Sequence, residues 1–102
     1  MTNENTKLEY FQSPTGRLED VRVGTTLYFA KTVGETDVYL FSGITGDFSP
    51  NHVDEEYMKQ GRYGERLAHG ALLVGFISAA SSRMRIGRTV SLGYDRVRFT
   101  AP

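Results

Sequence analysis

The 102-residue sequence contains no cysteine, no excess of charge of either sign and no apolar run long enough to cross a membrane. Without cysteine, disulfide bonds and thiolate metal sites are excluded, and a reducing compartment is favoured. The 12 basic and 12 acidic residues cancel. No overall field therefore favours nucleic acid or an anionic membrane as a partner.

The longest apolar stretch, Ala68–Ala80, is too short to span a bilayer and is interrupted by His69, two glycines and Ser78. A buried core helix is the better interpretation. The first residues, Met1–Lys7, are polar and acidic and contain no apolar signal core. We therefore expect a cytoplasmic protein that does not bind membranes.

The length allows one small domain. We expect a loosely ordered segment over residues 1–12 and a single domain over residues 13–102. Ser13-Pro14-Thr15-Gly16 is typical of a turn. Thr25–Val33, rich in β-branched and aromatic residues, predicts a strand that Gly34 ends.

Helices are predicted after this strand. Thr36 is an expected N-cap for a short helix that runs towards Gly43 and Gly46, and Asp54 is the expected cap of a second helix ending near Gln60-Gly61. The longest helix is predicted from His69 to about Met84, with a wide apolar stripe.

Thr89–Thr100 predicts a second long strand, whose alternation changes phase near Gly93, as at a β-bulge. Two strands cannot cover an apolar helix on every side. We therefore expect either a second chain or a longer domain to supply the missing cover.

Beyond Leu67, arginine dominates the charged residues, with Asp95 as the one acid. Two interpretations are open: a solvated helix end and strand surface, or a local patch for a phosphorylated substrate. The arginines are Arg83, Arg85, Arg88, Arg96 and Arg98.

A carboxylate and an imidazole, Asp47 and His52, lie five residues apart on a loop punctuated by glycine and proline. Loops of this kind hold reactive groups when a rigid scaffold positions them. Together the two groups can hold one water and move its protons, because histidine titrates near neutrality. The alternative is that Asp47 caps the loop and His52 is an incidental polar residue.

The second signal is Gly70, at the start of the predicted long helix. The first N–H groups of a helix are unpaired and lie at its positive end. Glycine lets a substrate carbonyl approach the backbone closely, so this N–H is a candidate oxyanion donor. The alternative is a glycine required for tight helix packing.

The run G-D-F-S-P-N-H-V-D over residues 46–54 and the run R-L-A-H-G over residues 66–70 together resemble the MaoC-like dehydratases, the (R)-specific enoyl-CoA hydratases of the hydratase 2 type. The resemblance covers about Val23 to Pro102. It implies an α+β hot-dog fold, in which an antiparallel sheet wraps a long central helix. It also implies that the C-terminal strands of the sheet lie beyond this chain.

By this resemblance, Asp47 and His52 activate a water and protonate the α-carbon in a syn addition, and the Gly70 N–H polarises the thioester carbonyl. The implied activity is that of a lyase, an enoyl-CoA hydratase or 3-hydroxyacyl-CoA dehydratase. The implied substrate is an acyl-CoA or acyl-carrier thioester. The family uses no metal or redox cofactor, and the expected assembly is a homodimer.

Four further residues are candidate substrate contacts. Ser49 replaces the usual asparagine of the motif, and Met58 replaces a small residue, so both bear on substrate choice. Ser42 could line the site or simply suit a short helix, and His69 could contact the site or be a structural residue at the helix start. A metal site of Asp47, His52, Asp54 and His69 is the remaining alternative, and we expect none.

Two other functions use the same fold. A hot-dog acyl-thioesterase would also place an oxyanion donor at a helix terminus, but would release a free thiol. A non-catalytic acyl-thioester-binding or assembly subunit would need neither Asp47 nor His52, and the presence of both argues against it.

Overall fold

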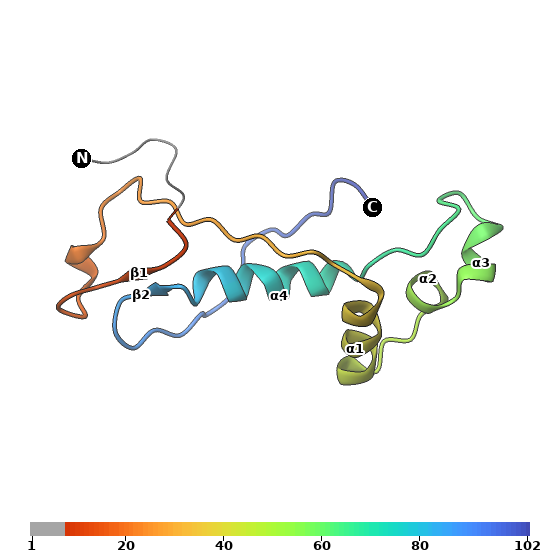
Figure 1. Cartoon of the computed structure of the whole chain (residues 1–102), viewed down its shortest axis with the longest axis horizontal. Helices are drawn as coiled ribbons and strands as arrows, with labels where there is room; N and C mark the ends of the chain where they lie inside the picture. Colours follow the sequence, from red (N-terminus) through yellow and green to blue (C-terminus); the bar gives the residue numbers. More distant parts are fainter. Residues whose placement is uncertain (1–7) are drawn as a thin grey trace. The chain divides into compact units, whose positions relative to one another are not determined.

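The computed structural model describes residues 8–102, so the prediction for residues 1–7 lies outside the described part of the chain. Its elements follow the order shown in Figure 1: β1 (Phe11–Gln12), the 3-10 helix η1 (Leu18–Asp20), α1 (Glu35–Thr45), α2 (Pro50–Val53), α3 (Glu55–Lys59), α4 (Gly70–Ser81) and β2 (Met84–Arg85). Among the described residues, no helix has the length and apolar character needed to cross a membrane.

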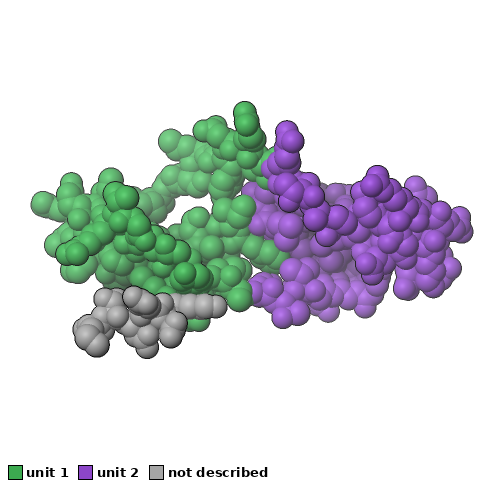
Figure 2. All heavy atoms as spheres, turned by 90° about the horizontal axis from the view of Figure 1, so that it is seen from above, with its two compact units in different colours: residues 1–30, 76–97 green, residues 31–75, 98–102 purple. Residues whose placement is uncertain are grey.

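The chain divides into two compact units, coloured separately in Figure 2. Among the described residues, unit 1 contains residues 8–30 and 76–97, and unit 2 contains residues 31–75 and 98–102. Helix α4 begins in unit 2 and ends in unit 1. The predicted catalytic pair, the predicted oxyanion donor and the four candidate substrate contacts all belong to unit 2.

Unit 1 is organised around β1 and β2. The two strands pair in parallel, with Phe11 opposite Met84. The Arg83 guanidinium lies 4.8 Å from the ring centroids of both Tyr10 and Phe29, within the range of cation–π attraction. The predicted turn at residues 13–16 is present, and Gly16 takes the positive φ of +74°.

The predicted strands differ from the structure. Residues 25–33 and 89–100 have no regular secondary structure, and neither segment is hydrogen-bonded into a sheet within residues 8–102. A ladder needs a neighbouring backbone, and the one sheet in the described chain is the parallel β1–β2 pair rather than the expected antiparallel sheet. The β-bulge expected near Gly93 is therefore absent from residues 89–100, because these residues form no ladder; Arg96 in this segment has φ +60°.

Helix α1 begins earlier than predicted. Its N-cap is Gly34 rather than Thr36, because the Gly34 N–H donates to the Asp37 carboxylate at 2.9 Å. This bond, followed by that from Lys31, holds the pKa of Asp37 below its ordinary value. The helix ends at Gly46, which has φ +84° and donates its N–H to the Ser42 carbonyl at 2.8 Å.

The predicted cap of α3 is confirmed, since the Asp54 side chain accepts the Tyr57 N–H at 3.0 Å. The sequence interpretation missed α2 and treated its residues as loop. Pro50 occupies the first helical position, where its missing N–H costs nothing. As predicted, Ser49 before it is not helical, with φ −53° and ψ 137°.

Helix α4 is shorter than predicted, and none of its twelve residues, all described, is fully buried. Leu73 and Ile77 remain 42% and 48% exposed. Met58 is the one buried hydrophobic side chain within residues 8–102, whereas three polar side chains, Ser13, Ser42 and His69, are buried. Two of these three, Ser42 and His69, belong to unit 2, so its interior is largely polar.

The end of α1 gives a direct test of this backbone. An alanine Cβ at Gly46 would touch nothing within 4 Å, but its φ of +84° disfavours any L side chain. We expect Gly46→Ala to lower the free energy of unfolding by about 1 kcal/mol. Gly43→Ala, in open space inside the same helix, should raise it by about 1 kcal/mol. Thermal unfolding measures both; equal effects would contradict the left-handed C-cap.

Candidate active site

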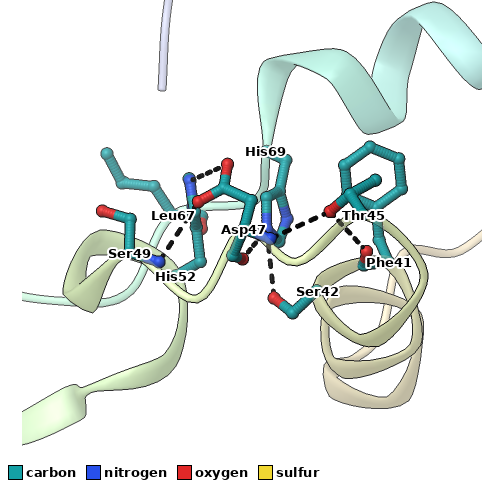
Figure 3. Close-up of polar contacts among 8 residues, drawn as sticks. All are labelled: Phe41, Ser42, Thr45, Asp47, Ser49, His52, Leu67 and His69. Carbon is teal, nitrogen blue, oxygen red and sulfur yellow. Dashed lines mark hydrogen bonds and ion pairs between the residues drawn. The ribbon is translucent and has the colours of Figure 1, made fainter.

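Short local hydrogen bonds shape the loop after α1 (Figure 3). The Thr45 hydroxyl donates to the Phe41 carbonyl at 2.8 Å and accepts the Asp47 N–H at 3.2 Å. The Ser49 N–H donates to Asp47 Oδ1 at 3.2 Å. One carboxylate oxygen of Asp47 is thereby held by the backbone, and the other, Oδ2, is left to face His52.

His52 lies on α2 and is oriented by a backbone carbonyl. Its Nδ1 is 2.8 Å from the carbonyl oxygen of Leu67. Because a carbonyl only accepts, Nδ1 must carry the proton, and in the neutral ring Nε2 then presents a lone pair. The Leu67 N–H in turn donates to the Asn51 carbonyl at 2.9 Å. Residues before α4 therefore fix the imidazole.

The two predicted catalytic side chains do face each other. His52 Nε2 lies 3.8 Å from Asp47 Oδ2, with side-chain exposures of 15% and 51%. This separation is too long for a direct hydrogen bond, but a water oxygen about 2.8 Å from each atom would bridge it. The arrangement can hold one water between an acceptor carboxylate and a basic nitrogen.

Ser42 and His69, two of the predicted substrate contacts, lie at the buried side of this pair (Figure 3). His69 Nε2 is 3.1 Å from both Ser42 Oγ and the Asp47 carbonyl oxygen. The His69 ring stacks on that of His52, with centroids 3.8 Å apart and 26° between planes. Ser42 and His69 are 0% and 2% exposed, so in this structure they touch the loop rather than open space.

Gly70 follows His69 directly and begins α4. A Cβ at this position would clash with the ring of Phe99. The contact agrees with close packing as the reason for glycine, and the ring atoms that a Cβ would meet belong to a side chain that is 53% exposed. The Gly70 N–H nevertheless belongs to the first turn, where N–H groups have no partner inside the helix. Its role as oxyanion donor stays a prediction.

Phe99 was not among the candidates. Its apolar alternation with Val97 indicated a strand face, but no local signal connects it with a glycine so distant in the sequence. With Gly70, Phe99 lines a cavity of about 360 Å³, whose walls are Tyr63, Leu67, Ala68, Gly70, Leu73 and residues 99–102.

Ser49 and Met58 have different surroundings. Ser49 is half-buried at the N-cap of α2, where its side chain makes no capping bond. Met58 is 5% exposed and lines a cavity that contains neither Asp47 nor His52. Their influence on substrate choice stays a prediction.

A second cavity, of about 350 Å³, adjoins His52 and is lined by Val33, Gly34, Glu35, Val38, His52, Arg66, Leu67 and Ala68. At its edge the Arg66 guanidinium donates to the Glu35 carboxylate and the Tyr39 hydroxyl. The bond from Arg66, aided by that from Tyr39, holds the pKa of Glu35 below its ordinary value, and Glu35 raises the pKa of Arg66. This cluster was not predicted.

Asp47, His52 and His69 could in principle offer ligands to a metal, since one ligand atom from each lies within 4.8 Å of the others. Stacked imidazoles, however, direct their lone pairs side by side rather than towards one point, as tetrahedral ligation requires. His69 Nε2 is also occupied by two oxygens. The fourth conceivable ligand, Asp54, caps α3. The donor set suits a bridging water better than a metal ion.

Residues 16–102 match the MaoC-like domain family. The chain is 35% identical, over all its 102 residues, to the (R)-specific enoyl-CoA hydratase of Rhodospirillum rubrum, of which it spans 66%. It is 33% identical over 75 residues to 3-hydroxyacyl-thioester dehydratase Z of Mycobacterium tuberculosis, a match that covers 70% of this chain and 50% of that protein. The chain thus spans between half and two thirds of these curated relatives.

Two solved structures are also similar. The crystal structure of protein af1124 from Archaeoglobus fulgidus has a TM-score of 0.63 and 32% identity, over 78% of this chain and 47% of that one. The X-ray structure of a monoamine oxidase regulatory protein from the same genus has a TM-score of 0.56 and 28% identity, over 67% of this chain and 48% of that one.

The contact of Gly70 with Phe99 can be tested by a double-mutant cycle. Gly70→Ala should destabilise the protein by about 1–3 kcal/mol through overpacking, and Phe99→Ala in the same chain should remove that penalty. Gly75→Ala, in the same helix with nothing within 4 Å of the new Cβ, should instead stabilise by about 0.5–1 kcal/mol. Additive effects of Gly70→Ala and Phe99→Ala in chemical denaturation would disprove the contact.

The Glu35–Arg66 ion pair should make stability depend on pH. Because the pKa of Glu35 is lowered on folding, its contribution is present above the unfolded glutamate pKa of about 4.3 and is lost as the pH falls through the lower folded value. Glu35→Gln should therefore lower Tm at pH 7, and the difference in Tm from the wild type should become smaller as the pH is lowered towards 3.

The matched control is Glu56→Gln, which removes an exposed ion pair to Lys59 at 3.2 Å within one helix and should change Tm little. If Glu35→Gln lowers Tm by the same amount at pH 7 and at pH 3, the ion pair is not the cause of the lower Tm.

Proposed function

Because the chain belongs to the MaoC-like domain family, we propose that it carries the active site of a hydratase that interconverts 2-enoyl-CoA and (R)-3-hydroxyacyl-CoA thioesters. The observation that carries the proposal is the gap of 3.8 Å between His52 Nε2 and Asp47 Oδ2. A water oxygen about 2.8 Å from each atom would bridge them, and both atoms can accept a hydrogen bond from it. The names of the two curated relatives support the same chemistry.

In the hydration direction, the water oxygen forms a bond to the β-carbon of the enoyl thioester. One water proton passes to His52 Nε2, whose opposite nitrogen is held by the Leu67 carbonyl. The same proton is then delivered to the α-carbon, so that one water is added and the pair is regenerated. Asp47 Oδ2 orients the water and its remaining hydrogen. Dehydration is the reverse of these steps.

The thioester carbonyl gains negative charge as the β-carbon is attacked. The Gly70 N–H is the proposed donor to this oxygen. It belongs to the peptide unit that joins Gly70 to His69, and the His69 ring stacks on His52. The start of the twelve-residue helix α4 adds the positive end of its dipole.

The proposed substrate is an acyl-CoA or acyl-carrier thioester, and no metal or redox cofactor takes part. The cavity of about 350 Å³ beside His52, with Val38, Leu67 and Ala68 in its walls, offers apolar contacts to an acyl group. We further infer a hot-dog fold for the complete domain, and a homodimer. The exposed apolar side chains of α4 support an assembly in which this helix is covered.

The test is hydration of crotonyl-CoA, followed by loss of enoyl absorbance. Asp47→Asn keeps the size of the side chain but removes its charge, and should lower kcat by about 10²–10⁴-fold. The control is Asp54→Asn, because asparagine caps helices as well as aspartate does, and this variant should retain the wild-type rate. Wild-type turnover by Asp47→Asn would refute the mechanism.

The same assay with a thiol-reactive dye separates the proposed reaction from thioester hydrolysis. A hydratase consumes the enoyl group and releases no thiol. Thiol release at the rate of substrate loss would identify a thioesterase instead.

A further inference from the structure

We propose that His69, held by Ser42, is a positioning residue that sets the geometry of the Asp47–His52 pair. The inference rests on the proposed function for its kinetic consequence, but its structural basis can be measured separately. It gives His69 and Ser42 a different role from the substrate contact expected from the sequence.

Burial is the first observation. His69 is 2% exposed and Ser42 is fully buried, so neither offers an atom to a substrate that arrives from solvent. Buried imidazoles and hydroxyls are retained only where hydrogen bonds compensate for lost hydration. Here Nε2 of His69 lies 3.1 Å from Ser42 Oγ on α1 and 3.1 Å from the carbonyl oxygen of Asp47.

The acceptor character of the Asp47 carbonyl fixes the tautomer. In a neutral imidazole one nitrogen carries the proton. If the proton were on Nδ1, the Nε2 lone pair would face the lone pairs of the Asp47 carbonyl oxygen, which is repulsive. The Nδ1–H would also be buried without an acceptor, because His69 Nδ1 has no hydrogen-bond partner in the described chain. The proton therefore belongs on Nε2, shared between the carbonyl and the serine.

His52, the second member of the proposed catalytic pair, is held by contact with the His69 ring. The face of His69 stacks on His52 at 3.8 Å, while Phe41 packs edge-on against His69 at 4.7 Å. One side chain thus restrains the Asp47 backbone by a hydrogen bond and the His52 ring by stacking. Loss of either restraint should change the 3.8 Å gap between Asp47 and His52, and small misplacements of reacting groups are costly.

The first experiment needs neither substrate nor variant. The chain has two histidines, and the contacts assign them opposite neutral tautomers: Nδ1–H for His52 and Nε2–H for His69. Long-range ¹H–¹⁵N correlation spectra of the whole chain at a pH where both rings are neutral should show one ring of each type. An Nδ1–H tautomer at His69 would overturn the proposal, whatever the activity of the protein.

The second experiment separates the two restraints. His69→Phe keeps an aromatic ring against His52 but removes the donor to Asp47. His69→Gln keeps a donor but removes the stack. We expect His69→Phe to lower kcat for crotonyl-CoA hydration by about 10²-fold with a change in KM below about two-fold, because no substrate contact is lost. His69→Gln should recover part of kcat.

Ser42→Ala should lower kcat less than His69→Phe, and should have no further effect on kcat in the His69→Phe background, since Ser42 acts through His69. The matched control is Ser13→Ala, in unit 1. It also removes a buried serine hydroxyl, whose hydrogen-bond partner is the Asp20 carboxylate. It should lower Tm but leave kcat unchanged.

Circular dichroism and Tm report whether each variant is folded. A folded His69→Phe variant with wild-type kcat would contradict a positioning role. So would a folded variant in which the whole loss of kcat/KM comes from a higher KM. If the wild-type chain does not hydrate crotonyl-CoA at all, the proposed function fails, and the tautomers of the two histidines still decide the inference about His69.

Discussion

The candidate site depends on one buried polar contact, the hydrogen bonding of the His69 imidazole inside unit 2. This unit contains a single buried hydrophobic side chain among its residues, all of which are described. A buried polar ring has to find partners, because an unmade hydrogen bond costs more than a made one gains. Ser42 and the Asp47 carbonyl are those partners.

Around that contact, each atom proposed to react is left available because the opposite atom of the same side chain has a hydrogen-bond partner. The Ser49 N–H holds Asp47 Oδ1 and leaves Oδ2 free, and the Leu67 carbonyl holds His52 Nδ1 and leaves Nε2 free. Asp47 remains half exposed while His52 is mostly buried. The pair can therefore meet a substrate and still keep a fixed geometry, as acid–base catalysis requires.

Features set by neighbouring residues could be predicted from the sequence. The Asp54 cap, the turn at residues 13–16 and the non-helical Ser49 before proline each follow from two to four adjacent residues. Features set by distant residues could not. The hydrogen bonds between His52 and Leu67 and between Ser42 and His69 span 15 and 27 residues, and the ring that a Cβ at position 70 would meet belongs to Phe99. The segment 25–33 likewise has the alternation of a strand, but it is not paired into a sheet within residues 8–102.

A crystal structure of the protein with bound 3-hydroxybutyryl-CoA would test the central claim most directly. The account predicts that the 3-hydroxyl oxygen lies within hydrogen-bond distance of both Asp47 Oδ2 and His52 Nε2, and that the thioester oxygen accepts from the Gly70 N–H. A product bound with its hydroxyl away from these two side chains, while Asp47 and His52 stay facing each other, would contradict it.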